Sequence, residues 1–587
     1  MAEQIVSPGV FTRENDLSFI QPAPLEAGTA FVGPTVKGPV DRPTVVTSYN
    51  EYVRKFGDTF ESGSSKEEFM TSMAVRSFFS QGGSTALVTR VVSGSFTPAS
   101  NTNIVAADNV NITVQPFEIE TLGSGVIYNN STAAIDPGQQ YSDSSLATGS
   151  IDNLRWEVNN VDNAKGTFSL LVRRGDDSIN NKIILESFNN LSLDPNSANY
   201  IESVIGNQVT SVTTDGSSYF VTKTGDYENK SNYIRVTAVN APTLNYLAND
   251  GATVNADSNL ISYSGSLPQA KSGSFYGADG NIVKAGMELH SDLDGAASFP
   301  QGMIPASYTN AVGVLANKDD YQFNVLVTPG LIYENSTFTS TVQSFITLVE
   351  NRGDAIYAPD LVGYGSTIAN VSTNASALNS SYAASYWPWL KLRSATGKNE
   401  WAPASVVIPG VFASNDNASA PWFAPAGLVR GGIPGVLDVE KKLPRSSRDT
   451  LYSGKVNPIA SFPGAGLAVF GQKTLQTKAS ALDRVNVRRL LIELKKEIAD
   501  VARNLVFEQN TITTRNRFLA RVNPYLESVV QQQGLYSYRV VMDDTNNTAD
   551  VIDRNQLIGQ IYIQPAKTAE FVVLDFSIEP TGATFGA

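Results

Sequence analysis

The run GLAVFGQKT, at residues 466–474, nearly matches a phosphate-binding P-loop. A P-loop needs backbone N–H groups that converge on the phosphates, and a lysine directly after the last glycine to reach the β- and γ-phosphates. Here Gln472 separates Gly471 from Lys473, and bulky apolar residues fill the loop positions. We therefore interpret the run as a plain β-strand.

The sequence HSDLDG, at residues 290–295, resembles the start of a calcium-binding loop. Such a loop begins with aspartate and has a bidentate glutamate at position twelve, where this chain has His290 and Gln301. We interpret it as a surface turn. His290 is the only histidine, so any Ser-His-Asp triad depends on it and multi-histidine metal sites are excluded. No G-x-S-x-G motif accompanies it.

A pair of carboxylates, Asp543 and Asp544, stands in a stretch whose composition is typical of a turn. A solvated turn explains the pair without any acid/base role. Because no motif supports catalysis, we predict that the protein is not an enzyme. We assign no catalytic, cofactor-binding or metal-binding residue and expect no cofactor.

The composition narrows the class of protein. The chain has 587 residues, 42% of them hydrophobic and 17% charged, which predicts globular structure in three to four domains. The net charge of −13 disfavours direct binding to nucleic acid or to an anionic membrane. The absence of cysteine excludes disulfides and thiolate chemistry. With no secretion-signal pattern and no long apolar run, we expect a soluble, cytoplasmically made product without stable membrane insertion.

The first part of the chain predicts an α/β core. One helix is expected at 49–58. A second helix is expected after Ser65 and Glu68, which form a capping box at its start. The run TALVTRVV, at 85–92, predicts a buried strand. Residues 94–315 are polar with short alternating runs, which indicates a β-rich insertion exposed on the outside.

The α/β pattern returns after the insertion. A strand at 323–330, an apolar helical stripe from Phe338 to Val349 and a second strand at 354–359 predict a βαβ unit with a parallel sheet. Gly353 is expected to cap the helix.

The longest predicted helix spans residues 483–509 and carries a single apolar stripe. Two shorter helical pieces are expected around Pro524, followed by strands at 536–544 and 556–565. The members of the apolar stripe are Val487, Leu490, Leu491, Leu494, Ile498, Val501, Ala502 and Leu505.

The sequences at the two ends of the chain predict extended segments. Residues 1–25 are interrupted by proline and glycine and predict an extended arm. The run TAEFVVLDFSI, at 568–578, predicts a final strand, although little chain follows to pair with it. Its apolar face makes it a half-buried strand in search of a sheet edge, and a hairpin back onto its own subunit is the alternative. The residues of this face are Val572, Leu574, Phe576 and Ile578.

Several stretches closely resemble tail sheath proteins of contractile-tailed bacteriophages. The resemblance covers about 1–93 and 320–587, and the insertion between them is similar only weakly. The stretches that carry it are SPGVFTRE, VVTSYNEYVRKFGD, FFSQGGSTALVTRVV, WFAPAGLVRGGI, and the runs at 481–510 and 536–576.

The resemblance implies a structural subunit that polymerises as stacked hexameric rings around a tail tube and contracts to drive the tube through the host envelope. It implies further copies of the chain, the tube protein, and baseplate and tail terminator proteins as partners. The protein is then located in the virion tail after assembly in the host cytoplasm. The family's strand-exchanging arms correspond here to 7–14 and 569–578, and the residues assigned to intersubunit pairing are Ser7, Pro8, Gly9, Val10, Phe11, Val572, Leu574, Phe576 and Ile578.

The expected fold class is a multidomain α/β protein whose core has a mixed sheet formed from N- and C-terminal parts, with a β-rich insertion and extended terminal arms. The expected units are a terminal arm at 1–25, a sheath core at 26–93 and 316–480, an outer insertion at 94–315, and a C-terminal core domain at 481–587 that ends in the arm 569–587.

Two hypotheses concern mechanism. The linkers QPAPLE at 21–26 and QPAKT at 564–568 are expected to act as hinges between rigid bodies. The basic face of the 483–509 helix is a candidate tube-facing surface, with a solvated helix face as the alternative. Its residues are Arg484, Arg488, Lys495 and Lys496. Other functions left open are the sheath of a bacterial contractile injection particle and a surface adhesin or carbohydrate-active protein.

Overall fold

The computed structural model describes most of the chain between residues 27 and 570. The predicted arm at 1–25, the apolar strand positions from Val572 onward and the calcium-like run at His290 lie outside the described residues. The described ranges are 27–62, 65–92, 94–101, 104–126, 141–147, 149–216, 218–257, 261–280 and 305–570.

The central sheet joins strands from both sides of the insertion, as predicted. Within the described residues its order is β16-β15-β1-β5-β2, and all neighbours are parallel except β2 and β5. Phe31 on the middle strand lies between Val88 and Val327. The strands are β1 (Ala27–Gly33), β2 (Thr44–Val46), β5 (Ala86–Arg90), β15 (Phe323–Ile332) and β16 (Ile356–Asp360).

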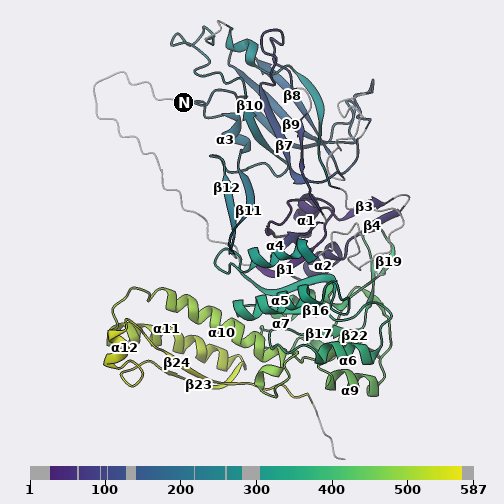
Figure 1. Ribbon diagram of the computed structural model, residues 1–587, viewed down its shortest axis with the longest axis vertical. Helices are drawn as coiled ribbons and strands as arrows, with labels where there is room; N and C mark the ends of the chain where they lie inside the picture. The colour runs from purple at the N-terminus through teal and green to yellow at the C-terminus, as the bar shows by residue number, and fades with distance from the viewer. Residues whose placement is uncertain are drawn as a thin grey trace, which may run out of the picture.

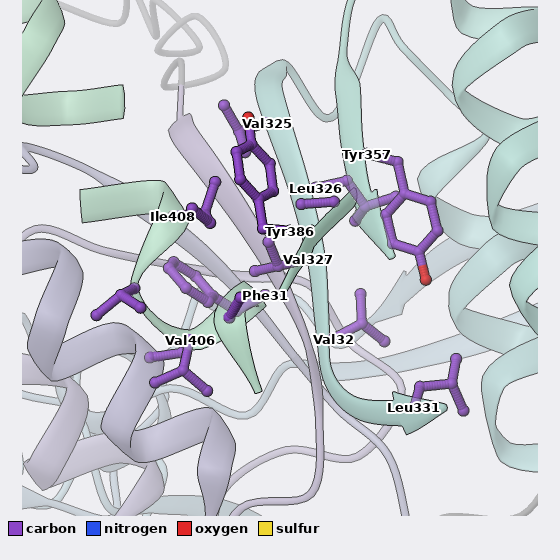
Figure 2. Packing of buried hydrophobic residues seen from close by; sticks show 14 of the residues in the cluster. Phe31, Val32, Val325, Leu326, Val327, Leu331, Tyr357, Tyr386, Val406 and Ile408 are labelled. Atoms are coloured by element: carbon purple, nitrogen blue, oxygen red, sulfur yellow. The ribbon is translucent and has the colours of Figure 1, made fainter. Parts of the chain in front are cut away.

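Helices enclose this sheet, so its strands are buried on both faces and carry nearly continuous apolar sequence. Figure 2 shows Phe31, Leu326 and Val327 packed among side chains from neighbouring elements. Gly353 caps α5 in the left-handed conformation, as the sequence predicts. The helices of this part are α1 (Tyr49–Phe56), α2 (Met70–Ser80), α4 (Pro305–Leu315), α5 (Thr339–Arg352), α6 (Ile368–Ser376), α7 (Ile408–Ala418), α8 (Gly427–Arg430) and α9 (Arg445–Ser453).

The predicted capping box is wrong. Ser65–Glu68 forms strand β4 of a hairpin with β3 (Thr59–Ser62), and α2 begins only at Met70. Glu68 is buried, where it accepts hydrogen bonds from the Ala395 backbone N–H and from Ser72, and pairs with Arg76. The Glu68 carboxylate therefore binds partners in the core, whereas in a capping box it would bind the backbone at the start of the helix.

Two small sheets extend the core. The run that resembles a P-loop contains strand β22, antiparallel to β21, so its interpretation as a strand is confirmed. One sheet contains β17 (Ser385–Trp387), β21 (Val456–Phe462) and β22 (Gly466–Val469), and the other β18 (Leu390–Arg393), β19 (Asn399–Ala402) and β20 (Val436–Val439).

The insertion is β-rich, as predicted, and has a hydrophobic core of its own. Its described residues form an antiparallel sheet of order β10-β9-β8-β14-β6-β7-β13, seen at the top of Figure 1. The elements are β6 (Pro98–Asn101), β7 (Phe117–Ser124), β8 (Leu154–Asp162), β9 (Thr167–Arg174), β10 (Ile184–Ser192), α3 (Ile201–Ile205), β13 (Ile234–Val239) and β14 (Lys271–Tyr276).

A separate hairpin connects the insertion to the core. Strands β11 (Val209–Asp215) and β12 (Ser218–Thr224) run from the insertion to α4 (Figure 1). Tyr219 lies so close to Gly313 on α4 that a Cβ atom built there would come within 2.2 Å of the tyrosine ring. The hairpin therefore packs on the helix only because residue 313 has no side chain.

The C-terminal part forms a third hydrophobic core. Helix α11 is continuous through Pro524, so the predicted break there is wrong. Pro524 is exposed, so the missing hydrogen bond faces solvent, while Phe518, Val522 and Leu526 are buried at helical spacing and hold the helix together. The elements are α10 (Val485–Arg503), α11 (Ile512–Gln531), β23 (Leu535–Val541), α12 (Ala549–Asp553) and β24 (Gln560–Pro565).

Candidate assembly interface

The C-terminal sheet is open on both sides. Strands β23 and β24 pair only with each other within the described residues. One face packs on the third core, whereas Tyr562 on the other face and Tyr536 at the register shift of β23 are 56% and 67% exposed. A two-stranded sheet is marginal alone, and its outer edges present unpaired N–H and C=O groups. The sheet is therefore able to accept a further strand at either edge.

After β24 the chain returns to the main core and is held there. The Glu570 carboxylate accepts hydrogen bonds from Arg484 Nε (2.7 Å), Tyr452 Oη (2.7 Å) and Gln472 Nε2 (3.0 Å). Thr568 also accepts a hydrogen bond from Gln472. Burial, and then the charge and hydrogen bond of Glu570, raise the pKa of Tyr452. The final segment thus leaves the described structure from a fixed point on the core.

Sequence reasoning missed this anchor. In the structure Arg484, one of the candidate tube-facing residues, pairs with Glu570 and with Asp483. The two members of the main ion pair are 86 positions apart, and neither stands in a recognisable motif. A carboxylate near the start of the predicted final strand was the one available signal.

The candidate tube-facing residues do not share one exposed surface. Arg488 is only 4% exposed, lies 4.0 Å above the Tyr382 ring and donates a hydrogen bond to Ser381. Burial lowers its pKa. Lys495 is exposed, whereas Lys496 is half-buried. The first half of α10 packs between the main core and the third core, so both of its faces are covered there.

The paired carboxylates considered in the sequence analysis lie in an ordinary structural turn. Asp543 and Asp544 lie in a turn, as predicted; Asp544 is exposed and pairs with Arg515.

Within the described ranges, no three His, Cys, Asp or Glu side chains are grouped so as to hold a metal ion. The same ranges contain no helix with the length and apolar character needed to cross a membrane.

An α/β core whose terminal sheet is open to additional strands is the architecture of a subunit that can assemble by strand exchange. Residues 305–475 match the model of the phage tail sheath protein central domain, and residues 477–579 match that of the phage tail sheath C-terminal domain. The chain belongs to the phage tail sheath protein family. This confirms the predicted family, which is a family of structural proteins.

Curated relatives support the assignment. The tail sheath protein of Vibrio phage KVP40 is 40% identical over 216 residues, which is 37% of this chain and 31% of that protein. The tail sheath protein of Enterobacteria phage T4 is 40% identical over 187 residues, or 32% and 28% of the two chains. The match thus spans about a third of the length of these relatives.

A solved structure extends the likeness to the whole fold. The sheath tail protein Lin1278 from Listeria innocua is 10% identical, with 92% of this chain and 95% of that chain covered and a TM-score of 0.51. At this identity the comparison establishes a shared fold. The predicted class, a multidomain α/β protein with a sheet built from both parts of the chain and a β-rich insertion, is confirmed by the described residues.

Proposed function

We propose that this protein is the sheath subunit of a contractile phage tail. Copies of it form stacked hexameric rings around the tail tube, and the lattice contracts to drive the tube through the host envelope. The observation that carries this proposal is the open β23–β24 sheet, which lies within the region that matches the sheath C-terminal domain. The tube, baseplate and tail terminator proteins are the further partners, and the virion tail is the location.

Neighbouring subunits are joined by donated strands. The final strand, 569–578, pairs with the sheet of one neighbour, and the opening segment, 7–14, serves the same purpose elsewhere in the lattice. About five ladder hydrogen bonds contribute roughly 1 kcal/mol each. Each large apolar side chain that becomes buried adds about 2 kcal/mol. A link of this strength persists while the subunits change their relative positions.

Contraction then moves packed bodies about short linkers. The linker 564–568, whose first two residues end β24, leads to the anchor at Glu570 and is one hinge. The linker 21–26 leads into β1 and is the other. The driving energy resides in subunit interfaces that are better satisfied in the contracted lattice, so no nucleotide hydrolysis is needed. The insertion, 94–315 apart from α4, lies on the outer surface of the sheath.

Strand donation is tested by a matched pair of substitutions. Leu574→Asp places a charge on the apolar face of the last strand, whereas Ser577→Asp places the same charge on the opposite face. We expect folded monomers that form no tubes for Leu574→Asp, as for deletion of 569–587, and normal tubes for Ser577→Asp, by electron microscopy. Normal polymerisation of the truncated chain refutes strand donation.

The same micrographs separate the remaining functions. Striated tubes of two diameters indicate a contractile sheath, and neighbouring genes then distinguish a phage tail from a bacterial contractile injection particle. Dispersed monomers that bind glycans indicate the adhesin or carbohydrate-active alternative, which the family match disfavours.

A further inference from the structure

A cavity of about 610 Å³ lies where the described chain ends. Its walls come from α8, α9, the residues that follow β22, and the segment 568–570. Pockets of about 300–1,000 Å³ are typical of ligand sites, so this one is large enough for several side chains.

The walls combine positive charge with apolar surface. Arg430, Arg445 and Arg448 outnumber the two acidic residues of the lining, Asp449 and Glu570. Phe470 also lines the cavity, and the Arg448 guanidinium lies 5.7 Å from the centre of its ring. On α8, whose ends line the cavity, Val429 is 94% exposed. A ligand that is mainly apolar but carries a carboxylate matches this lining.

Two buried polar atoms in the wall have no partner. Among the described residues, neither Arg430 Nε nor Gln472 Oε1 makes a hydrogen bond, although both atoms are buried. Such atoms are rare in folded proteins because each one left unsatisfied costs free energy.

The sequence directly after this point has the required chemistry. Glu570 lines the cavity and is anchored by Arg484, Tyr452 and Gln472. The next residues read FVVLDFSIE, which is apolar with acidic residues at Asp575 and Glu579. Three extended residues reach about 10 Å, so the segment can enter the cavity at once.

We propose that, before assembly, this cavity holds the segment 571–579 of its own chain. An apolar strand left free in a monomer invites indiscriminate pairing and aggregation, and docking in the cavity prevents this. Assembly then requires the segment to leave the cavity. This role in assembly rests on the strand donation proposed above, whereas docking in the monomer does not.

Because the chain has no cysteine, a disulfide between two introduced cysteines tests the docking directly. Ala426→Cys lies in the cavity wall and Val573→Cys lies in the segment. With a mild oxidant we expect the monomeric double variant to form an intramolecular disulfide, seen as a shifted monomer band on a non-reducing gel. Val573→Cys combined with Ala252→Cys, an exposed site in the insertion, should not form it.

Charge reversal provides a second measurement. Arg445→Glu, in the cavity wall, should slow cross-linking by roughly two- to fivefold, the effect of one exposed ion pair. Lys442→Glu makes the same change at an exposed site outside the cavity lining and should leave the rate unchanged. Equal rates for both variants contradict a charged contact between wall and segment.

The outcomes separate this proposal from strand donation. A cross-linking yield no higher than in the Ala252 control overturns docking, and so does a disulfide that forms only between mixed single-cysteine chains. If docking holds, the oxidised monomer should form no tubes until it is reduced. Tubes formed by the oxidised monomer leave docking in place and overturn strand donation instead.

Discussion

At the scale of single residues, Asp360 is the carboxylate whose surroundings are most unusual. It is buried at the end of β16, accepts a hydrogen bond from Ser405 Oγ at 2.6 Å, and faces the Gly330 backbone N–H at 3.3 Å. Burial raises its pKa to about 7, although these hydrogen bonds oppose the shift. A carboxylate that ionises only near neutral pH makes the stability of the core depend on pH.

The sign of this dependence follows from the folded pKa, which lies above the unfolded one. The folded state retains its proton longer, so this contribution to stability is complete below about pH 4 and is lost as the pH rises to about 7. The loss is on the order of 4 kcal/mol for the full shift. Asp360→Asn should remove it, whereas Asp550→Asn, at an exposed site, should not.

The measurement is unfolding by urea at pH 5 and pH 8, followed by tryptophan fluorescence. Trp387 and Trp389 line the same small cavity as Asp360 and report on this part of the core. If Asp360→Asn loses as much stability between the two pH values as the unchanged chain, the assignment to Asp360 is wrong.

At the scale of elements, charged residues of α10 that look alike in the sequence have different surroundings in the structure. Arg488 packs on Tyr382 inside the protein, whereas Lys495, seven positions later, is exposed. Seven residues are two helical turns, so both lie on one face, but only the first half of that face is covered by the core. The helical period was predictable, and the point at which the cover ends was not.

The two residues should therefore respond differently to charge reversal. Arg488→Glu buries an unpaired carboxylate and should cost about 3–5 kcal/mol in thermal or urea unfolding. Lys495→Glu should leave unfolding within about 0.5 kcal/mol, as is usual for exposed sites. If α10 faces an acidic tube, Lys495→Glu also lowers tube-templated assembly at low salt; unchanged assembly removes the tube hypothesis.

At the scale of the whole molecule, the insertion is joined to the core by more than its connecting chain. The β11–β12 hairpin reaches α4, and Tyr219 occupies the space beside Gly313. Alanine in place of a helical glycine normally stabilises a helix by about 1 kcal/mol. Here the added Cβ atom collides with the ring, so the usual gain is expected to become a loss.

A double-mutant cycle tests this connection. Gly313→Ala alone should destabilise the chain and make the hairpin easier to cleave by protease. In a Tyr219→Ala background the same change should stabilise α4, by up to about 1 kcal/mol. The same effect of Gly313→Ala in both backgrounds contradicts the proposed contact.

The sequence by itself determined the local structure and the family. Apolar spacing predicted the strands β5, β15 and β16 of the central sheet and the helix α5, because buried strands and amphipathic helices have characteristic patterns of apolar residues. It erred at Ser65–Glu68 and at Pro524, where the core supplied partners that a local rule cannot include.

Only the tertiary structure decided where the charged groups lie. The contacts of Glu570 with Arg484, Tyr452 and Gln472 join segments about 86 to 118 positions apart. The burial of Asp360 and Arg488 likewise depends on which elements cover them. Periodicity describes one element at a time, whereas burial and ion pairing are set by the packing of several.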